Sequence, residues 1–380
     1  MTILLLCLSG LFFLLAIHPF LIYPLTLRLL PKRPMQPQMA PAPLTYAICM
    51  CAYNERAVIE QKAENLRSLQ KAIPGLQVYI YIDAASDGTA EALEPYKNDF
   101  FIHVSPERHG KTYGMNLLVA QATADIIIFT DANVMLDVAS IPALARYYAD
   151  PQVGCVCGHL IYVNGEGTAT AANGTLYWRL EEHIKQLECE TGSVMGADGS
   201  IFSVRRALHR PPPPDIIDDM FVSFSVLCDG ARIVRAPDVI AYEESVTVAS
   251  EEFRRKVRIA CQAFNVHRLM WPRLRQLPAL DLYKYISHKL LRWFVLLWLV
   301  LAALCFELAL LWAGYVWVAL ALPFLGGIVL WGGYKLRLPL IPQIVDILTA
   351  FLGAALGVWR SIKGERFQTW ALAQSIRQKK

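Results

Sequence analysis

Three acidic side chains stand where apolar, β-branched runs of the sequence end. Glu55 lies in the stretch CAYNER, Asp83 follows VYIYI, and Asp131 follows IIIFT. Ligands of open α/β sheets bind beyond the carboxyl ends of the strands. A single acid after a strand is commonly a turn residue, but three acids in equivalent positions indicate one shared edge. We therefore expect these acids to lie together and to form a binding site.

The types of these residues suit the parts of a nucleoside diphosphate. Carboxylates such as Glu55 and Asp83 accept hydrogen bonds from a base N–H and from ribose hydroxyls. Asp131 and Asn133 offer oxygen ligands of the kind that hard divalent cations take. Lys111, in the stretch HGK, opens a predicted helix, where its point charge can bind phosphate. The sequence lacks GxxxxGK[ST] and GxGxxG. The motifs that would identify a phosphate-loop protein or a dinucleotide-binding fold are therefore missing.

An α/β domain must position these side chains. Short β-branched runs alternate with helical patterns over residues 44–284, which is typical of such a domain. The runs predict strands at Leu44–Met50, Gln77–Ile82, Phe100–Val104 and Asp125–Thr130. The patterns between them predict helices at Arg56–Ala72, Ala90–Tyr96 and Lys111–Ala122.

The composition argues against a simple soluble enzyme. Of the 380 residues, 55% are hydrophobic and only 18% are charged, against about 45–50% and about 25% in soluble domains. The net charge of +4 lacks the basic excess of a dedicated nucleic-acid binder. Nine scattered cysteines do not form a disulfide framework. The close pairs Cys49/Cys51 and Cys155/Cys157 are expected to be buried free thiols in a reducing compartment.

The chain begins with a predicted transmembrane helix over residues 1–27, which contain no charged side chain. The run from Ile3 to Tyr23 is long enough to cross about 30 Å of hydrocarbon. The basic residues follow this run instead of preceding it, unlike those of a cleaved signal peptide; they are Arg28, Lys32 and Arg33. The positive-inside rule then places the next domain in the cytoplasm, at the inner membrane. Residues 28–43 are rich in proline and predict a stiff linker.

A second apolar region, residues 285–359, predicts two to three further transmembrane or interfacial helices. Between residues 293 and 334 the one charge is Glu307, and this length suits two spans with a turn near Ala313 or Gly314. Residues 338–359 either cross the membrane or lie in its surface as an interfacial or re-entrant helix. The basic tail, residues 360–380, carries a local charge of +5. The charge rule favours a tail on the cytoplasmic side, at the membrane surface, and hence the interfacial alternative.

The ordered set of motifs resembles the GT-A domain of the inverting family-two glycosyltransferases, especially the membrane-bound polysaccharide synthases. The similarity covers roughly residues 44–270, and the apolar segments on either side are arranged as in those enzymes. Each motif is weak alone, but their order and spacing are specific. The motifs are CAYNER, DAASDGT, GKTYGMN, FTDAN, ETGSVMGADGSIFSVRR and IIDDMFVSFSVLCDG.

The resemblance implies a donor site. By position, Tyr53 and Glu55 match the loop around the nucleotide base, and Asp83 matches the carboxylate that binds base and ribose. Lys111 matches the lysine near the donor phosphates. Asp131 and Asn133 occupy the DxD motif, which holds the sugar nucleotide with Mg²⁺ or Mn²⁺. Asn133 departs from that motif, because an amide oxygen ligates a cation without contributing charge. Outside this set, Asp87 of the DGT turn is expected to cap the next helix.

The resemblance also implies an acceptor side. Asp218 and Asp219 fall on the family's ED pair, and Asp219 matches the catalytic base. One base is enough for direct inversion, and an adjacent carboxylate tends to raise its pKa. Asp198, in GADGS, is a candidate acceptor contact. The family's QxxRW motif is present only with altered spacing, as Gln262, Arg268 and Trp271.

Three arginines, Arg254, Arg255 and Arg258, share one face of the predicted helix that contains these last residues. Arg255 and Arg258 are candidate substrate-binding residues that would neutralise the leaving diphosphate. The same cations could equally meet anionic lipid head groups. The sequence leaves both interpretations open.

The expected activity is inverting transfer of a sugar from a nucleotide-diphosphate sugar to a lipid-linked or polysaccharide acceptor at the cytoplasmic membrane face. This activity would serve exopolysaccharide or glycolipid synthesis. Other polysaccharide-assembly proteins are possible partners, and no nucleic-acid partner is expected. Two alternatives stay open. One is a processive polysaccharide synthase, against which the altered QxxRW spacing and the few spans argue. The other is a non-catalytic, transferase-like membrane scaffold; a transporter is disfavoured by the large predicted cytoplasmic domain.

Overall fold

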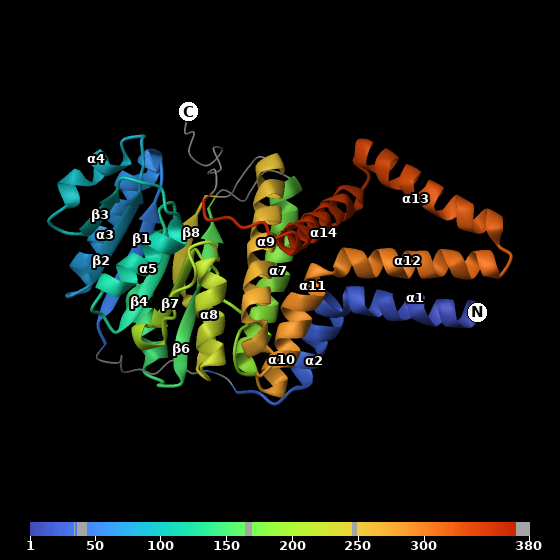
Figure 1. Cartoon of the computed structure of the whole chain (residues 1–380), viewed down its shortest axis with the longest axis horizontal. Coiled ribbons are helices and arrows are strands. Elements are labelled where there is room, and N and C mark those ends of the chain that lie inside the picture. Colours follow the sequence, from blue (N-terminus) through green and yellow to red (C-terminus); the bar gives the residue numbers. More distant parts are fainter. Residues whose placement is uncertain (34, 36–43, 164–168, 245–248, 370–380) are drawn as a thin grey trace.

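The computed structural model shows an α/β domain joined to an arm of apolar helices (Figure 1). It describes residues 1–33, 35, 44–163, 169–244 and 249–369, with the backbone alone for 169–178. Most of the predicted linker and the last eleven residues of the basic tail therefore lie outside the described residues.

The first half of the domain is a parallel sheet in the strand order β3-β2-β1-β4. The elements are β1 Tyr46–Ala52, α3 Arg56–Ala72, β2 Gln77–Asp83, α4 Thr89–Leu93, β3 Phe101–Ser105, α5 Lys111–Gln121 and β4 Ile126–Asp131. The predicted strands and helices of this half are confirmed to within about two residues at most ends. β1 and β4 are almost wholly buried, as expected of strands covered by helices on both faces.

The second half continues the same eight-stranded sheet as β4-β7-β6-β8-β5, with β7 antiparallel to both of its neighbours. The elements are β5 Met135–Leu136, α6 Ser140–Tyr148, β6 Val153–Tyr162, α7 Ala169–Glu190, β7 Ile201–Arg205, α8 Asp218–Cys228 and β8 Arg232–Glu243. All nine cysteines are free, and the close pairs lie on β1 and β6. The expectation of unpaired thiols is confirmed.

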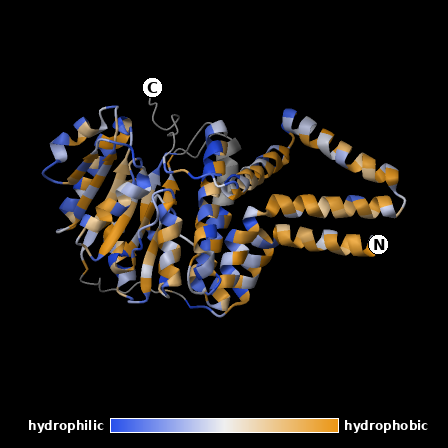
Figure 2. Cartoon of the chain, in the orientation of Figure 1, coloured by the Kyte–Doolittle hydropathy of each residue, from blue (hydrophilic) through white to orange (hydrophobic). Residues whose placement is uncertain are grey.

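The helical arm holds four helices that are long and apolar enough to cross a membrane (Figure 2). They are Thr2–Leu29 (α1 Thr2–Ile17, a π-helical turn His18–Ile22 and α2 Tyr23–Leu29), α12 Val295–Trp312, α13 Val316–Lys335 and α14 Ile341–Ile362. Large apolar side chains on them face outward; Trp317, for example, is 83% exposed. Such a surface is unstable in water and suits hydrocarbon. The predicted pair of apolar helices with a turn near Ala313 is confirmed.

One face of helix α14 packs on helix α9 of the α/β domain. Gly353 and Gly357 lie against α9, Ala249–Leu274; a Cβ at Gly357 would come within 2.6 Å of the Ala260 side chain. The Ser361 hydroxyl, which is fully buried, donates to Asn265 Oδ1 of α9 at 2.6 Å. Figure 1 shows α14 running back from the end of α13 toward α9. Whether α14 crosses the membrane or lies in its surface stays a prediction.

A buried polar cluster joins the helical arm to the α/β domain, where α10 Ala279–Tyr285, a π-helical turn Ile286–Leu290 and α11 Leu291–Trp293 lead into α12. The two ring nitrogens of His288 lie 2.6 Å from Glu188 Oε1 and 2.9 Å from Glu181 Oε1, both on α7. Tyr23 of α2 donates to the same Glu188 oxygen at 2.5 Å, and Arg292 pairs with Glu181. Because buried charges are costly unless paired, these contacts fix the arm relative to α7.

Candidate active site

Lys111 lies at the centre of the site and joins residues that are distant in the sequence. Its Nζ is 2.7 Å from Asp131 Oδ1 and 3.7 Å from Asp218 Oδ2. Burial alone would lower the pKa of Lys111, but the charges of Asp131 and Asp218 raise it above its ordinary value. The lysine is therefore a permanent cation at the start of α5. Gly110 precedes it with φ of 89°, a conformation that favours glycine.

Asp219 occupies the first turn of α8 beside its neighbour Asp218. Burial first, and then the charge of Asp218, raise the pKa of Asp219 to about 7, while Lys111 opposes the rise. Gly199 lies next to Asp219 and Lys111. A Cβ added at Gly199 would lie 2.9 Å from Asp219 Oδ2 and 3.7 Å from Lys111 Nζ. A carboxyl group that titrates near neutrality in such a site is suited to general-base catalysis.

Side-chain contacts to the main chain hold the loops around Asp219 in place. Thr112 Oγ1 donates to the Ile216 carbonyl at 2.8 Å, and Asn116 Nδ2 donates to the Pro212 carbonyl at 2.8 Å. Helix α5 therefore fixes the proline-rich loop before α8. On the other side, the Ala197 N–H donates to Ser223 Oγ of α8 at 3.1 Å. The predicted acceptor loop, residues 196–200, is thereby tied to the helix that carries the base.

The nucleotide side is built around Asp83 at the end of β2. Its two carboxylate oxygens accept the N–H groups of His109 at 2.7 Å and of Gly110 at 3.0 Å. Asp83 thus shapes the turn before Lys111, and its predicted contact with base and ribose stays a prediction. The Arg108 guanidinium lies 3.6 Å from the centre of the Tyr53 ring. Sequence reasoning missed Arg108, for which the only signal was its place next to HGK.

Glu55 and Asp87 lie where α3 and α4 begin. Glu55 is buried, and its N–H donates to Thr89 Oγ1 at 2.9 Å. Asp87 Oδ1 accepts the Thr89 N–H at 3.1 Å, and Asp87 Oδ2 accepts the Arg56 N–H at 2.9 Å. The expectation that Asp87 caps the next helix is confirmed. The role of Glu55 toward a nucleotide base stays a prediction.

Side chains of α3 and β8 hold the turn that carries Asp131 and Asn133. Lys62, fully buried on α3, donates from Nζ to the Val134 carbonyl and lies 3.4 Å from Thr130 Oγ1. Asn133 Nδ2 donates to Glu243 Oε1 of β8 at 3.0 Å. Burial above all, and the charge of Asp131, raise the pKa of Glu243, against the lowering effect of Arg255. Sequence reasoning missed both Lys62 and Glu243.

The donors at this turn fit the divalent cation that the resemblance implies. Within the described ranges, no group of three or more His, Cys, Asp or Glu side chains is arranged to hold a metal ion. Asp131 and the amide of Asn133 nevertheless supply hard oxygen donors. Glu243 Oε2, buried beside them, has no hydrogen-bond partner among the described residues. A buried carboxylate oxygen without a partner is costly, and a cation would remove that cost.

Two of the three arginines of α9 approach the site. Arg255 and Arg258 are half-buried, whereas Arg254 is exposed. Asp131 interacts electrostatically with both half-buried arginines, and Asp219 with Arg258. Burial, and then the charge of Arg255, lower the pKa of Arg258 to about 10. This placement favours the diphosphate over lipid head groups as the partner of Arg255 and Arg258.

The other predicted residues take contacts that the sequence did not indicate. Asp198 is paired with Lys185 of α7, and its predicted contact with an acceptor is untested. Gln262 and Arg268 bind main-chain carbonyls, those of Phe367 at 3.0 Å and of Ser361. Gln262 and Arg268 thus hold the end of α14 and the chain that follows it.

The start of the basic tail lies on the α/β domain. Asn265 Nδ2 donates to the Glu365 carbonyl at 3.0 Å, and Arg366 pairs with Asp215 at 2.7 Å. Gln368 Nε2 donates to the His109 carbonyl at 2.8 Å, next to Gly110. Within the described residues, side-chain amides and an arginine hold the start of the tail on the domain, and its predicted place at the membrane surface stays a prediction.

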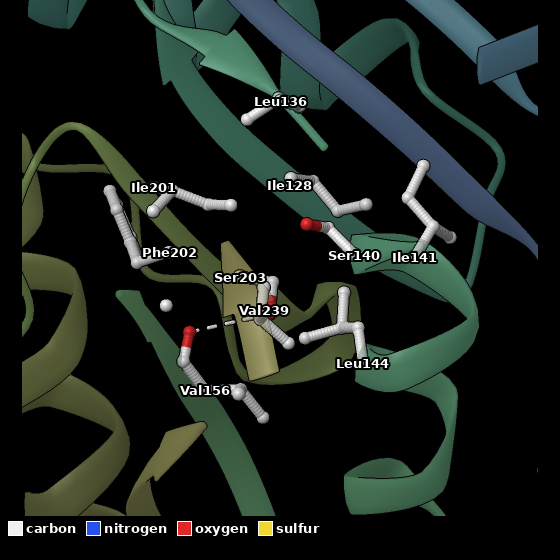
Figure 3. Close-up of a pocket in the computed structure, with 11 residues that line it drawn as sticks. Ile128, Leu136, Ser140, Ile141, Leu144, Val156, Ile201, Phe202, Ser203 and Val239 are labelled. Carbon is white, nitrogen blue, oxygen red and sulfur yellow. Dashed lines mark hydrogen bonds between the residues drawn. The ribbon is translucent and has the colours of Figure 1, made fainter. Parts of the chain in front are cut away.

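An apolar cavity lies elsewhere in the domain, between α6 and the sheet (Figure 3). Its walls contain no charged side chain; they include Ile128, Leu136, Leu144, Val156, Phe202 and Val239. A ligand site needs convergent polar groups. We therefore treat the cavity as a gap in the core and the Lys111 region as the candidate active site.

Comparison with known proteins agrees with this geometry. The family described as Glycosyl transferase family 2 matches residues 47–210. The match contains β1 to β4 and the turns with Asp83, Lys111 and Asp131, and the same α/β domain continues through α8 and β8 beyond it.

Two curated relatives cover the glycosyltransferase domain. An N-acetylglucosaminyltransferase of Rhizobium meliloti (strain 1021) is 26% identical over 222 residues, which are 54% of this chain and 52% of that protein. A poly-beta-1,6-N-acetyl-D-glucosamine synthase of Staphylococcus aureus (strain COL) is 26% identical over 195 residues, 50% of this chain and 47% of that protein. The chain thus spans about half the length of the curated relatives it matches.

A solved structure shares the fold over nearly the whole chain. The mannosyltransferase PcManGT from Pyrobaculum calidifontis, in complex with GDP-Man and Mn²⁺, superposes with a TM-score of 0.72 at 19% identity. The alignment covers 95% of this chain and 99% of that one. The glycosyltransferase domain therefore has the predicted GT-A fold, with one apolar helix segment before it and three after it.

Proposed function

We propose that the protein transfers a sugar, with inversion, from a nucleotide-diphosphate sugar to a lipid-linked or polysaccharide acceptor at the cytoplasmic face of the inner membrane. The observation that carries the proposal is the joining of Asp219, Lys111 and Asp131 in one half-buried group. It combines a base that titrates near neutrality with a permanent cation. The family match and the glycosyltransferase relatives support a nucleotide sugar as donor.

Each of these residues has its own role in the proposed reaction. Asp219 takes the proton of the acceptor hydroxyl, and the oxygen of that hydroxyl attacks the anomeric carbon of the sugar. The bond from that carbon to the diphosphate breaks, and Lys111 and Arg258 offset the charge on the leaving group. A divalent cation, Mg²⁺ or Mn²⁺, held by Asp131 and Asn133 would add Lewis-acid stabilisation of the diphosphate. Direct displacement through one base inverts the anomeric carbon.

The apolar helices support a membrane-bound acceptor. The glycosyltransferase domain is attached at both ends, by the segment Thr2–Leu29 and by α12 to α14. Attachment at both ends limits its distance from the lipid surface, where a lipid-linked acceptor or a growing polymer would be concentrated. Basic residues after the first helix favour a cytoplasmic domain.

The proposal is tested with a panel of nucleotide sugars, including GDP-mannose and UDP-N-acetylglucosamine. Purified membranes are scored for release of nucleoside diphosphate with Mg²⁺, with Mn²⁺ and with a chelator. We expect one donor to release product far above background, and Asp219→Asn to abolish that release. Release from no donor, or full activity of Asp219→Asn, would contradict the proposal. NMR of the first product reports the anomeric configuration.

A processive synthase is the second candidate, because one relative is a polymer synthase by name. The number of sugars added per acceptor at limiting enzyme separates the two activities. A processive enzyme gives long chains on few acceptors, whereas single addition gives one sugar on many. A non-catalytic scaffold would give neither product in the wild-type protein.

A further inference from the structure

An unexplained carboxylate faces the turn that carries Asp131 and Asn133. Glu243 is the last residue of β8, and only 6% of its surface is exposed. Its Oε1 accepts the hydrogen bond from Asn133 Nδ2, and its Oε2 is buried without a partner among the described residues. The Ser200 hydroxyl lies nearby but makes no hydrogen bond of standard geometry with Oε2. Buried polar atoms without partners call for an explanation such as a bound ion.

The contact with Glu243 determines which atom of Asn133 remains for a cation. An ionised carboxylate only accepts hydrogen bonds, so the amide atom that faces Glu243 must be the nitrogen. The amide oxygen, Oδ1, is then directed away from Glu243 Oε1. Glu243 thereby orients Asn133 so that its oxygen, the one atom of the amide able to ligate a hard cation, is presented.

The turn alone carries less negative charge than a divalent cation requires. Asp131 contributes one charge and Asn133 contributes none. Lys111, 2.7 Å from Asp131, offsets even that charge. Affinity for hard cations rises with the number of charged oxygen ligands. A second carboxylate close to Asp131 would restore the charge that the asparagine removes, and Glu243 interacts electrostatically with Asp131 across the site.

We propose that Glu243 is the second carboxylate of the cation site, binding the divalent cation through Oε2 while Oε1 keeps Asn133 oriented. The donor set is then two carboxylates and one amide oxygen, all hard ligands of the kind that Mg²⁺ and Mn²⁺ take. Glu243 comes from β8, where Tyr242 pairs with Met135 of β5, and lies 110 residues after Asn133. The proposal rests on the proposed function, because the cation serves to bind the donor diphosphate.

The test measures Mn²⁺ binding to the full-length protein in detergent by electron paramagnetic resonance, with GDP or UDP present. The free aqueous Mn²⁺ signal disappears on binding, so the readout needs no turnover. We expect Glu243→Gln to weaken Mn²⁺ binding by about 10- to 100-fold, the usual effect of altering a residue that binds or orients a metal ligand. Glu244→Gln, one residue further along, is the matched control and should bind Mn²⁺ as the wild type does.

An exchange variant separates charge from mere structural support. In Asn133→Asp combined with Glu243→Gln, the carboxylate and the amide trade places, which preserves both the hydrogen bond and the total charge. We expect this pair to recover Mn²⁺ affinity to within about threefold of the wild type, because ligand types and charge are unchanged. Thermal unfolding in EDTA should show Glu243→Gln at least as stable as the wild type, since a buried unpaired charge is removed.

Two results would overturn the inference: wild-type Mn²⁺ affinity in Glu243→Gln, or no recovery in the exchange variant. A third would be a wild-type protein that binds neither Mn²⁺ nor Mg²⁺ yet turns over its donor. In that case the proposed function stands, and Lys111 and the arginines of α9 neutralise the diphosphate without a cation. Failure of every donor in the panel would instead overturn the proposed function itself.

Discussion

The pKa of Asp219 makes a quantitative prediction about the pH dependence of transfer. Burial and the charge of Asp218 raise this pKa to about 7, and only the ionised form accepts the proton of the acceptor. With a pKa of about 7, roughly a tenth of the enzyme has an ionised base at pH 6 and roughly nine tenths at pH 8. We therefore expect kcat/KM to rise about tenfold between pH 6 and pH 8.

The neighbours of Asp219 determine the direction in which the profile moves. Asp218 raises the pKa of Asp219 and Lys111 lowers it. Asp218→Asn should therefore shift the rising limb of the profile to lower pH, and Lys111→Met should shift it to higher pH. Both variants lose activity, but the position of the limb is read from the shape of the curve rather than from its height.

The measurement is the pH dependence of kcat/KM for the preferred donor, at constant ionic strength and saturating metal. This quantity reports groups of the free enzyme, which is the state that the structure describes. Asp215→Asn, at a half-buried carboxylate that pairs with Arg366, provides a control for a nearby charge outside this group of residues. Shifts of the two variants in the same direction, or a flat profile from pH 6 to pH 8, would refute the assignment of the base.

Three further predictions concern positions outside this pair. Gly199→Ala would place a Cβ 2.9 Å from Asp219 Oδ2; we expect kcat to fall about 100-fold with little change in donor KM, measured by steady-state kinetics. Burial lowers the pKa of Lys62 to about 7, below its value in the unfolded chain, so the unfolded state binds more protons between those values. Wild-type stability relative to Lys62→Met should therefore rise with pH from about 7.5 to 9.5, by at most about 1.4 kcal/mol per pH unit; a constant difference in thermal unfolding would disprove this. Tyr23→Phe removes the donor to buried Glu188 Oε1 at 2.5 Å and should cost about 1–3 kcal/mol, seen as a lower unfolding temperature in detergent.

The sequence was sufficient to predict the first half of the sheet and the acids at its edge. Runs such as AICM and IIIF are long, apolar and β-branched, and their secondary structure is local. Lys111 could be placed near Asp131 because parallel strands bring their carboxyl ends to one edge. These inferences need only periodicity and topology.

The contacts across the sheet could not be predicted in the same way. Glu243 meets Asn133, and Gln368 meets His109, over separations of 110 and 259 residues. Nothing in the local sequence around Glu243 distinguishes it from Glu244, and burial alone makes one of them part of the site. Lys62 likewise has the spacing of an ordinary helix residue, and only packing shows that it is fully buried.

The contact between Gln368 and the His109 turn has a consequence for biosynthesis. The chain is made from its N-terminus, so the glycosyltransferase domain leaves the ribosome before α12, α13 and α14 exist. Gln368 is made after all of them, and it reaches His109 only once α14 has docked on α9. The edge of the candidate site that Gln368 contacts is therefore completed last, after the four apolar helices have been made.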